Sequence, residues 1–101
     1  MIYTTDILLA IAREFEPKIA ELGGHVAIGG SCVYRGYSTK DMDLMFYPHK
    51  KENPLDKQAV INLLYALGWQ EVRTPVSGTE VPDVLVMQKG ELRVDFFILN
   101  R

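Results

Sequence analysis

Two aspartates separated by one residue open an otherwise apolar run, residues 41–46, which reads DMDLMF. Side chains two apart on a β-strand point to the same face, so Asp41 and Asp43 share one face. Met42 and Leu44 then enter a core on the other face. Carboxylates held side by side repel, and a hard divalent cation with oxygen ligands relieves that repulsion. The run predicts a strand that is covered on one face and carries a metal-binding acid pair on the other.

A glycine-rich turn precedes this strand. Gly29-Gly30-Ser31 follows a short apolar strand expected at residues 25–28, and nine residues separate Ser31 from Asp41. Glycines let backbone N–H groups approach a phosphate, and the turn into a following short helix offers donors to an anion. Ser31 adds a hydroxyl there. Taken alone, Ser31 is better suited to cap the helix that begins at Cys32, and the two roles are compatible. The turn predicts a phosphate-sized opening beside the acid pair.

A third acid, Asp95, lies in the last expected strand, residues 92–99. Asp95 shares one row of that strand with Arg93 and Phe97, opposite the apolar row that faces the core. Burying an acid among apolar residues without compensation would cost several kcal/mol or force protonation. A metal shared with Asp41 and Asp43 would compensate Asp95, and Arg93 is a cation that would neutralise the acids when no metal is bound.

The rest of the chain alternates helix and strand signals. A helix is expected over residues 5–22, capped by Thr5 or Asp6, with Pro17 either kinking it or dividing it in two. A second helix is expected at residues 55–67, a strand at 69–74, a loop at 75–82, and a hairpin that turns at Gly90. This order predicts one domain, residues 1–101, of the α+β class: a small mixed β-sheet with helices packed against it.

Composition restricts the partners and the compartment. A net charge of −2 leaves no global basic field for nucleic-acid phosphates. The single cysteine, Cys32, excludes an internal disulfide and a thiolate zinc site, which favours a reducing compartment. There is no basic segment before the first apolar stretch, and no apolar run approaches the roughly 20 residues that span a bilayer. We therefore expect a cytoplasmic protein without membrane contact.

Four residues between the turn and the acids each have two interpretations. Arg35 and Lys40 either contact phosphates or balance the acid pair as surface cations. Tyr34 and Tyr37 either stack on a nucleobase or pack on the short helix. We expect Cys32 and Trp69 to be buried.

The combined pattern resembles the DNA polymerase β-type nucleotidyltransferase superfamily, over nearly the whole chain, and in size its minimal members. The resemblance implies that Gly29, Gly30 and Ser31 contact a triphosphate, and Lys40 is added as a further nucleotide contact because it is close to the acids. Asp41 and Asp43 would hold two Mg²⁺ ions, for which Mn²⁺ could substitute. Asp95 would complete the site of the catalytic metal and help to deprotonate the acceptor hydroxyl.

The function that the resemblance implies is transfer of a nucleoside monophosphate from a nucleoside triphosphate, with ATP expected, to an acceptor hydroxyl with release of pyrophosphate. The acceptor is left open among protein, RNA and small molecule, because the helical domain that selects substrates in larger members does not follow Asp95. Two alternatives are an antitoxin-like partner-binding module of a toxin–antitoxin pair and a nucleotide-binding domain without turnover. Residues 96–99, if they form a sheet edge or are partly uncovered, would be covered by a second copy in a homodimer or by a small helical protein.

Overall fold

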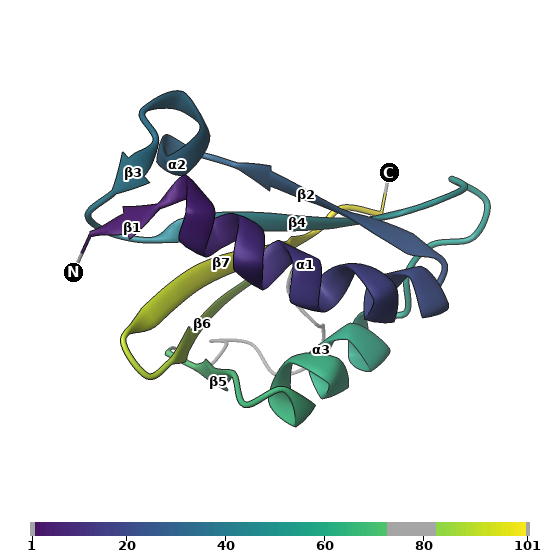
Figure 1. Cartoon of the computed structure of the whole chain (residues 1–101). Coiled ribbons are helices and arrows are strands. Elements are labelled where there is room, and N and C mark those ends of the chain that lie inside the picture. Colours follow the sequence, from purple (N-terminus) through teal and green to yellow (C-terminus); the bar gives the residue numbers. More distant parts are fainter. Residues whose placement is uncertain (1, 73–82, 101) are drawn as a thin grey trace.

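A computed structural model of the chain describes residues 2–72 and 83–100 (Figure 1). The elements within these residues are, in order, β1 (Tyr3–Thr4), α1 (Thr5–Glu21), β2 (Gly24–Gly29), α2 (Ser31–Tyr34), β3 (Tyr37–Ser38), β4 (Met42–Pro48), α3 (Lys57–Ala66), β5 (Gln70–Glu71), β6 (Val84–Lys89) and β7 (Leu92–Ile98).

Five of the strands form one mixed sheet in the order β2-β4-β7-β6-β5. Neighbours β4 and β7 run parallel, and the other neighbours run antiparallel. Strands β1 and β3 form a separate two-stranded antiparallel ladder. The predicted α+β class with a mixed sheet is confirmed. The small ladder was not predicted, because strands of two residues are too short to show an alternating pattern.

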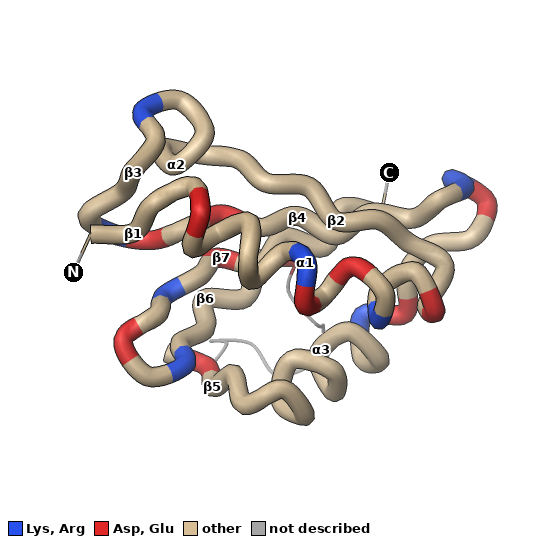
Figure 2. Tube along the Cα trace, viewed as in Figure 1, with Lys and Arg blue, Asp and Glu red and all other residues tan. Residues whose placement is uncertain are grey.

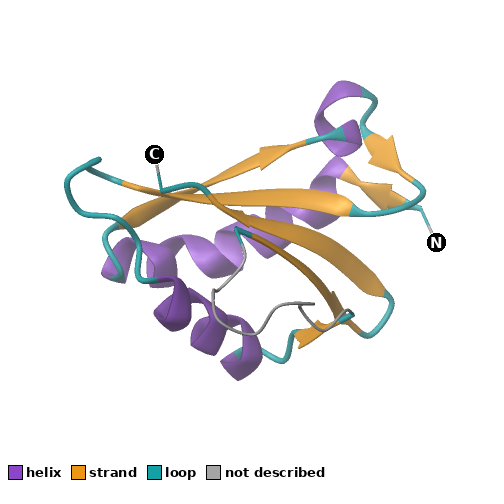
Figure 3. Cartoon of the chain, turned by 180° about the vertical axis from the view of Figure 1, so that it is seen from behind, coloured by secondary structure: helices purple, strands orange, loops and turns teal. Residues whose placement is uncertain are grey.

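Both long helices, α1 and α3, lie on the same face of the five-stranded sheet (Figures 1 and 3). The rows of β4 and β7 that face these helices are almost completely buried: Met42, Leu44, Phe46, Val94, Phe96 and Ile98. Phe15 of α1 packs on Phe46 and Phe96, with ring centroids 5.5 and 5.4 Å apart. Trp69 completes this aromatic cluster, with its ring centroid 5.1 Å from that of Phe96, as its predicted burial requires. The cluster fixes how α1 sits on the sheet.

Helix α1 is continuous through Pro17, so division into two helices was wrong. Ile11, Phe15 and Ile19 are buried on both sides of the proline and hold the two halves on one core, while Pro17 itself is exposed. The cap is also different from the prediction. Thr4 caps the helix, and its hydroxyl accepts a hydrogen bond from the backbone N–H of Ile7 at 3.4 Å.

The C-terminal strand β7 lies between β4 and β6, so residues 96–99 do not form a sheet edge. The predicted hairpin is confirmed: Lys89 pairs with Leu92 across a turn in which Gly90 has a φ of +60°. The strand expected at residues 69–74 is limited to Gln70–Glu71 where the structure describes it. Residues 73–74 and the loop expected at 75–82 lie outside the described residues. None of the described helices combines the length and the hydropathy that a bilayer crossing requires.

Candidate functional site

The register of the sheet brings the predicted acids together. Asp43 of β4 is the direct partner of Asp95 of β7, and Gly29 of β2 is the partner of Asp43 on its other side. Neighbouring strands lie about 4.8 Å apart, so the two aspartates occupy adjacent positions on one face of the sheet. Asp41 directly precedes β4. Figure 2 colours the acidic positions red, including those on β4 and β7.

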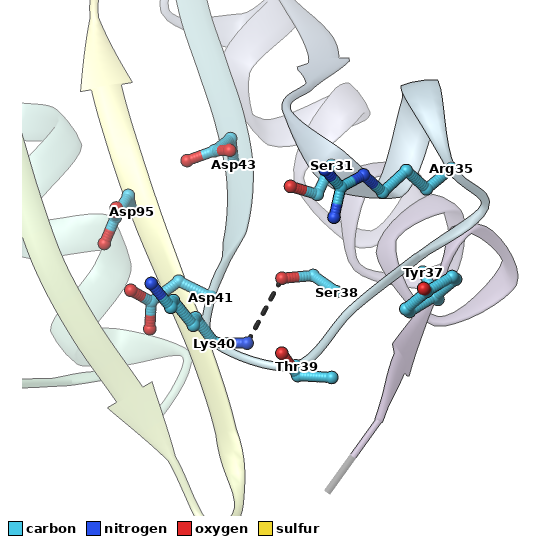
Figure 4. A pocket seen from close by; sticks show the side chains of 9 residues that line it. All are labelled: Ser31, Arg35, Tyr37, Ser38, Thr39, Lys40, Asp41, Asp43 and Asp95. Carbon is cyan, nitrogen blue, oxygen red and sulfur yellow. Dashed lines mark hydrogen bonds between the residues drawn. The ribbon is translucent and has the colours of Figure 1, made fainter.

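The three aspartates line a cavity of about 310 Å³ (Figure 4). Its lining residues are Ser31, Arg35, Tyr37, Ser38, Thr39, Lys40, Asp41, Asp43 and Asp95. Strands β4 and β7 supply the carboxylates on one wall. The facing wall is the segment from α2 to Thr39, which supplies hydroxyl groups and a guanidinium group.

The two glycines at the end of β2 pack closely against neighbouring side chains. Gly30 has a φ of +71°, and a Cβ atom added to it would lie 1.8 Å from Oδ2 and 2.8 Å from Cγ of Asp43. A Cβ atom added to Gly29 would lie 2.5 Å from the methyl carbon of Met45. Only glycine therefore lets the end of β2 approach the carboxylate of Asp43 this closely. Neither glycine lines the cavity, so their predicted contact with a triphosphate stays a prediction.

Ser31 does not cap α2, which corrects one of its two interpretations. Gly30 occupies the N-cap position, and no side-chain hydrogen bond closes that end of the helix. The Ser31 side chain instead lines the cavity and points toward Asp43 (Figure 4). Because α2 is a single turn, its dipole is small. An anion in this cavity would therefore depend on side-chain donors.

Two cations line the cavity. Arg35 lines the cavity together with Ser31, and in the view of Figure 4 its side chain extends toward the aspartates. Lys40 precedes Asp41, and its backbone N–H donates to the hydroxyl of Ser38 at 3.3 Å. Arg93 belongs to the acidic face of β7, where it pairs with Gln88, and it does not line the cavity.

The tyrosines do not behave alike. Tyr34 is 90% exposed, so its packing on the short helix was a wrong interpretation. Tyr37 is 45% exposed and lines the cavity. Sequence reasoning missed Ser38 and Thr39 as lining residues. Their only signal was a short polar run directly before the acid pair.

The electrostatics agree with the repulsion expected from the sequence. Burial raises the pKa of Asp43, and the neighbouring charge of Asp41 raises it further. The thiol of Cys32, which is buried as predicted, has a raised pKa because of its burial and of the charge of Asp43. A cation in the cavity would offset the charge repulsion that contributes to the raised pKa of Asp43 and to that of Cys32.

The donor set suits magnesium, although the site is not a preformed cage. In residues 2–72 and 83–100, no three carboxylate, imidazole or thiol groups are arranged closely enough to hold a metal ion by themselves. Mg²⁺ is usually held by one or two carboxylates together with substrate phosphates, and not by an all-protein cage. Asp41, Asp43 and Asp95 supply hard oxygen ligands of this kind, so they fit an ion that arrives with a triphosphate.

Comparisons with protein-family models, with curated proteins and with solved structures find no match to this chain. The family resemblance therefore depends on the motif residues alone. The geometry of the site does not depend on that resemblance. Two aspartates on adjacent parallel strands, and a third beside them, face a wall of hydroxyl and cationic groups.

Proposed function

We propose that this chain is a metal-dependent nucleotidyltransferase that transfers a nucleoside monophosphate from a nucleoside triphosphate to an acceptor hydroxyl. The pairing of Asp43 with Asp95 is the observation that carries the proposal, because it gathers carboxylates from two separate segments at one cavity. A protein has little structural reason to align two acids across neighbouring strands, since like charges opposite each other destabilise a sheet. The facing hydroxyls and cations have the chemistry that a triphosphate needs.

The roles of the residues follow from the two walls. Ser31, Arg35 and Lys40 would bind the triphosphate through a hydroxyl and two positive charges. Asp41, Asp43 and Asp95 would hold Mg²⁺, which when bound neutralises the phosphates and favours the ionised acceptor hydroxyl. The acceptor oxygen would bond to the α-phosphorus while the bond to the bridging oxygen of the β-phosphate breaks. Pyrophosphate would leave with that electron pair, and Asp95 would take the acceptor proton.

Calorimetry with ATP and Mg²⁺ tests the binding part of this proposal. The double substitution Asp41→Asn and Asp43→Asn should abolish the metal-dependent part of the ATP affinity. A matched control replaces two exposed acids outside the cavity, Asp6→Asn and Glu52→Gln, which removes the same charge. Equal loss in both double variants would indicate a general charge effect and would contradict the site. Mass spectrometry of candidate acceptors after incubation with each labelled triphosphate then tests transfer.

A second candidate function is that of a partner-binding module. It is favoured by the face of the sheet opposite the helices α1 and α3, which is the face that also carries the acids. Ala27, Met45, Phe97 and Val86 occupy this face next to the acids, and each is only partly buried. Within the described residues no helix covers this face (Figure 3). Apolar patches that are left open on a sheet commonly bind another protein.

The partner expected from the sequence, a second copy or a small helical protein, would dock on this apolar face and not on a sheet edge. Sedimentation across a concentration range distinguishes a dimer from a monomer. Phe97→Ser removes apolar surface without adding a charge beside Asp95, so it should abolish self-association without changing ATP affinity in the monomer. If Phe97→Ser leaves the association unchanged, the apolar face is not the interface.

A further inference from the structure

The wall of the cavity that faces the aspartates has little core of its own. Residues 30–40 form the one-turn helix α2, the two-residue strand β3 and the loops around them. Only Cys32 and Ser38 in this segment are buried. Two-stranded ladders this short are not stable alone. Something outside the segment must hold Ser31, Arg35 and Lys40 at the distance from the carboxylates that a triphosphate requires.

The N-terminal residues Tyr3–Thr5 make those contacts, and we call them the N-terminal clip. Tyr3 pairs with Ser38, and Thr4 pairs with Tyr37, in the β1–β3 ladder. The backbone N–H of Thr5 donates to the carbonyl of Gly36 at 3.2 Å.

Cys32 is held from the same side. The Thr5 hydroxyl donates a hydrogen bond to the Cys32 carbonyl. The Cys32 thiol in turn donates to the Tyr3 carbonyl, at a distance of 3.7 Å. The clip thus contacts the segment at α2, at Gly36 and at β3. These three points fix the orientation of the whole wall, because the connections between them are short.

The side chain of Tyr3 attaches the clip to the strand that carries Asp95. Its ring is 5% exposed, and its hydroxyl donates to the carbonyl of Glu91 at 2.6 Å. Glu91 lies in the turn between β6 and β7, four residues before Asp95. One residue therefore contacts the phosphate-facing wall through its backbone and the carboxylate wall through its side chain.

We propose that Tyr3 is a positioning residue for the nucleotide. Tyr3 couples residues 30–40 to β7 and so sets the separation of the two walls of the cavity. The inference rests on the proposed function, in that the ligand is a nucleoside triphosphate. Pairing between β4 and β7 already aligns Asp43 with Asp95. Loss of the clip should therefore weaken the hold on the phosphates and leave the acid pair aligned.

The substitution Tyr3→Phe tests this coupling because it keeps the ring and removes only the hydrogen bond to Glu91. Tyr65→Phe is the matched control: its hydroxyl donates at 2.8 Å to the Glu71 carboxylate, and neither residue lines the cavity. We expect Tyr3→Phe to weaken the affinity for ATP with Mg²⁺ about three- to tenfold, the equivalent of one lost hydrogen bond. In turnover, KM for ATP should rise more than kcat falls. Tyr65→Phe should change neither quantity.

Amide hydrogen exchange of the nucleotide-free protein separates this inference from the proposed function. Tyr3→Phe should speed the exchange of amides in residues 31–40 relative to both the wild type and Tyr65→Phe. If the wild type does not bind ATP with Mg²⁺, the proposed function fails. Faster exchange would then still support the coupling of the wall to β7, and unchanged exchange would overturn it.

Unchanged ATP affinity in a folded Tyr3→Phe variant would overturn the positioning role. If that variant does not fold, Thr5→Val removes the hydrogen bond to the Cys32 carbonyl from the other side of the clip. Thr5→Val should likewise weaken ATP affinity and speed exchange in residues 31–40. Wild-type affinity in Thr5→Val would contradict the inference.

Discussion

Gly30→Ala is the sharpest single perturbation of the site, because the added Cβ atom would collide with Asp43, while Gly30 itself does not line the cavity. Gly30 has a φ of +71° and a ψ of −159°, a region of backbone space that is almost restricted to glycine. A Cβ atom there would lie 1.8 Å from Oδ2 of Asp43 and 3.3 Å from its Cβ. Rotation of the Asp43 side chain would relieve the first contact but not the second.

The expected magnitude has two parts. The backbone strain costs about 1–3 kcal/mol, and an off-rotamer Asp43 adds about 1 kcal/mol, so the unfolding free energy should fall by about 2–4 kcal/mol. For a domain of this size that lowers Tm by on the order of 10–20 °C. Because the clash would displace the Asp43 carboxylate from its place in the cavity, metal-dependent ATP affinity should fall at least about tenfold.

Gly23→Ala is the matched control for Gly30→Ala. Gly23 lies outside the cavity lining and has a φ of +87°, but an added Cβ atom there meets no atom within 4 Å. Thermal unfolding should show a loss of about 1–2 kcal/mol in this variant, and calorimetry should show ATP affinity close to that of the wild type. If Gly30→Ala and Gly23→Ala bind ATP equally well, the contact of an added Cβ atom with Asp43 does not shape the site.

Three further predictions concern single side chains of the cavity. Ser31→Ala should weaken ATP affinity by about 1–2 kcal/mol and leave Tm unchanged, because Ser31 lines the cavity without capping α2; a drop in Tm alone would contradict this. Asp43→Asn should raise the stability of the nucleotide-free protein at neutral pH, because the raised pKa of Asp43 means that its charged form destabilises the fold. In urea titrations that gain should shrink as the pH falls through the raised pKa and vanish below the ordinary value of 3.8. Arg35→Gln should weaken ATP binding less at high salt than at low salt, whereas Arg13→Gln, on the exposed side of α1, should have no effect at either.

The acid positions could be predicted because they follow from the period of a strand. Alternation alone places Met42 and Leu44 in the core and Asp43 on the opposite face, and the buried rows of β4 and β7 confirm this. The direct pairing of Asp43 with Asp95 could not be predicted, since a register between distant strands leaves no local signal. The same reason left open whether residues 96–99 would form a sheet edge, and the structure places β7 inside the sheet.

The supporting contacts were less accessible to sequence reasoning. The role of Gly30 in packing on Asp43 depends on a distance between two segments, and the clip depends on strands of two residues. Tyr3 carries no pattern that separates it from an ordinary buried aromatic residue. Ser31 was ambiguous because a serine before a helix can cap the helix and contact a phosphate at the same time. The N-cap at Gly30 excludes the capping role, and phosphate contact stays a prediction.

The central position of β7 has a consequence for the order in which the protein folds. The last strand of the sheet in sequence inserts between β4 and β6, which come earlier in the chain. Parallel pairing across such a long separation forms slowly compared with the neighbouring hairpins. Until β7 docks, no strand joins the β2–β4 pair to the β5–β6 pair, and Asp43 of β4 has no neighbouring strand on the side where β7 will lie. A chain emerging from synthesis therefore cannot align Asp43 with Asp95 before β7 is available, so the cavity lacks one of its three carboxylates until that strand has docked.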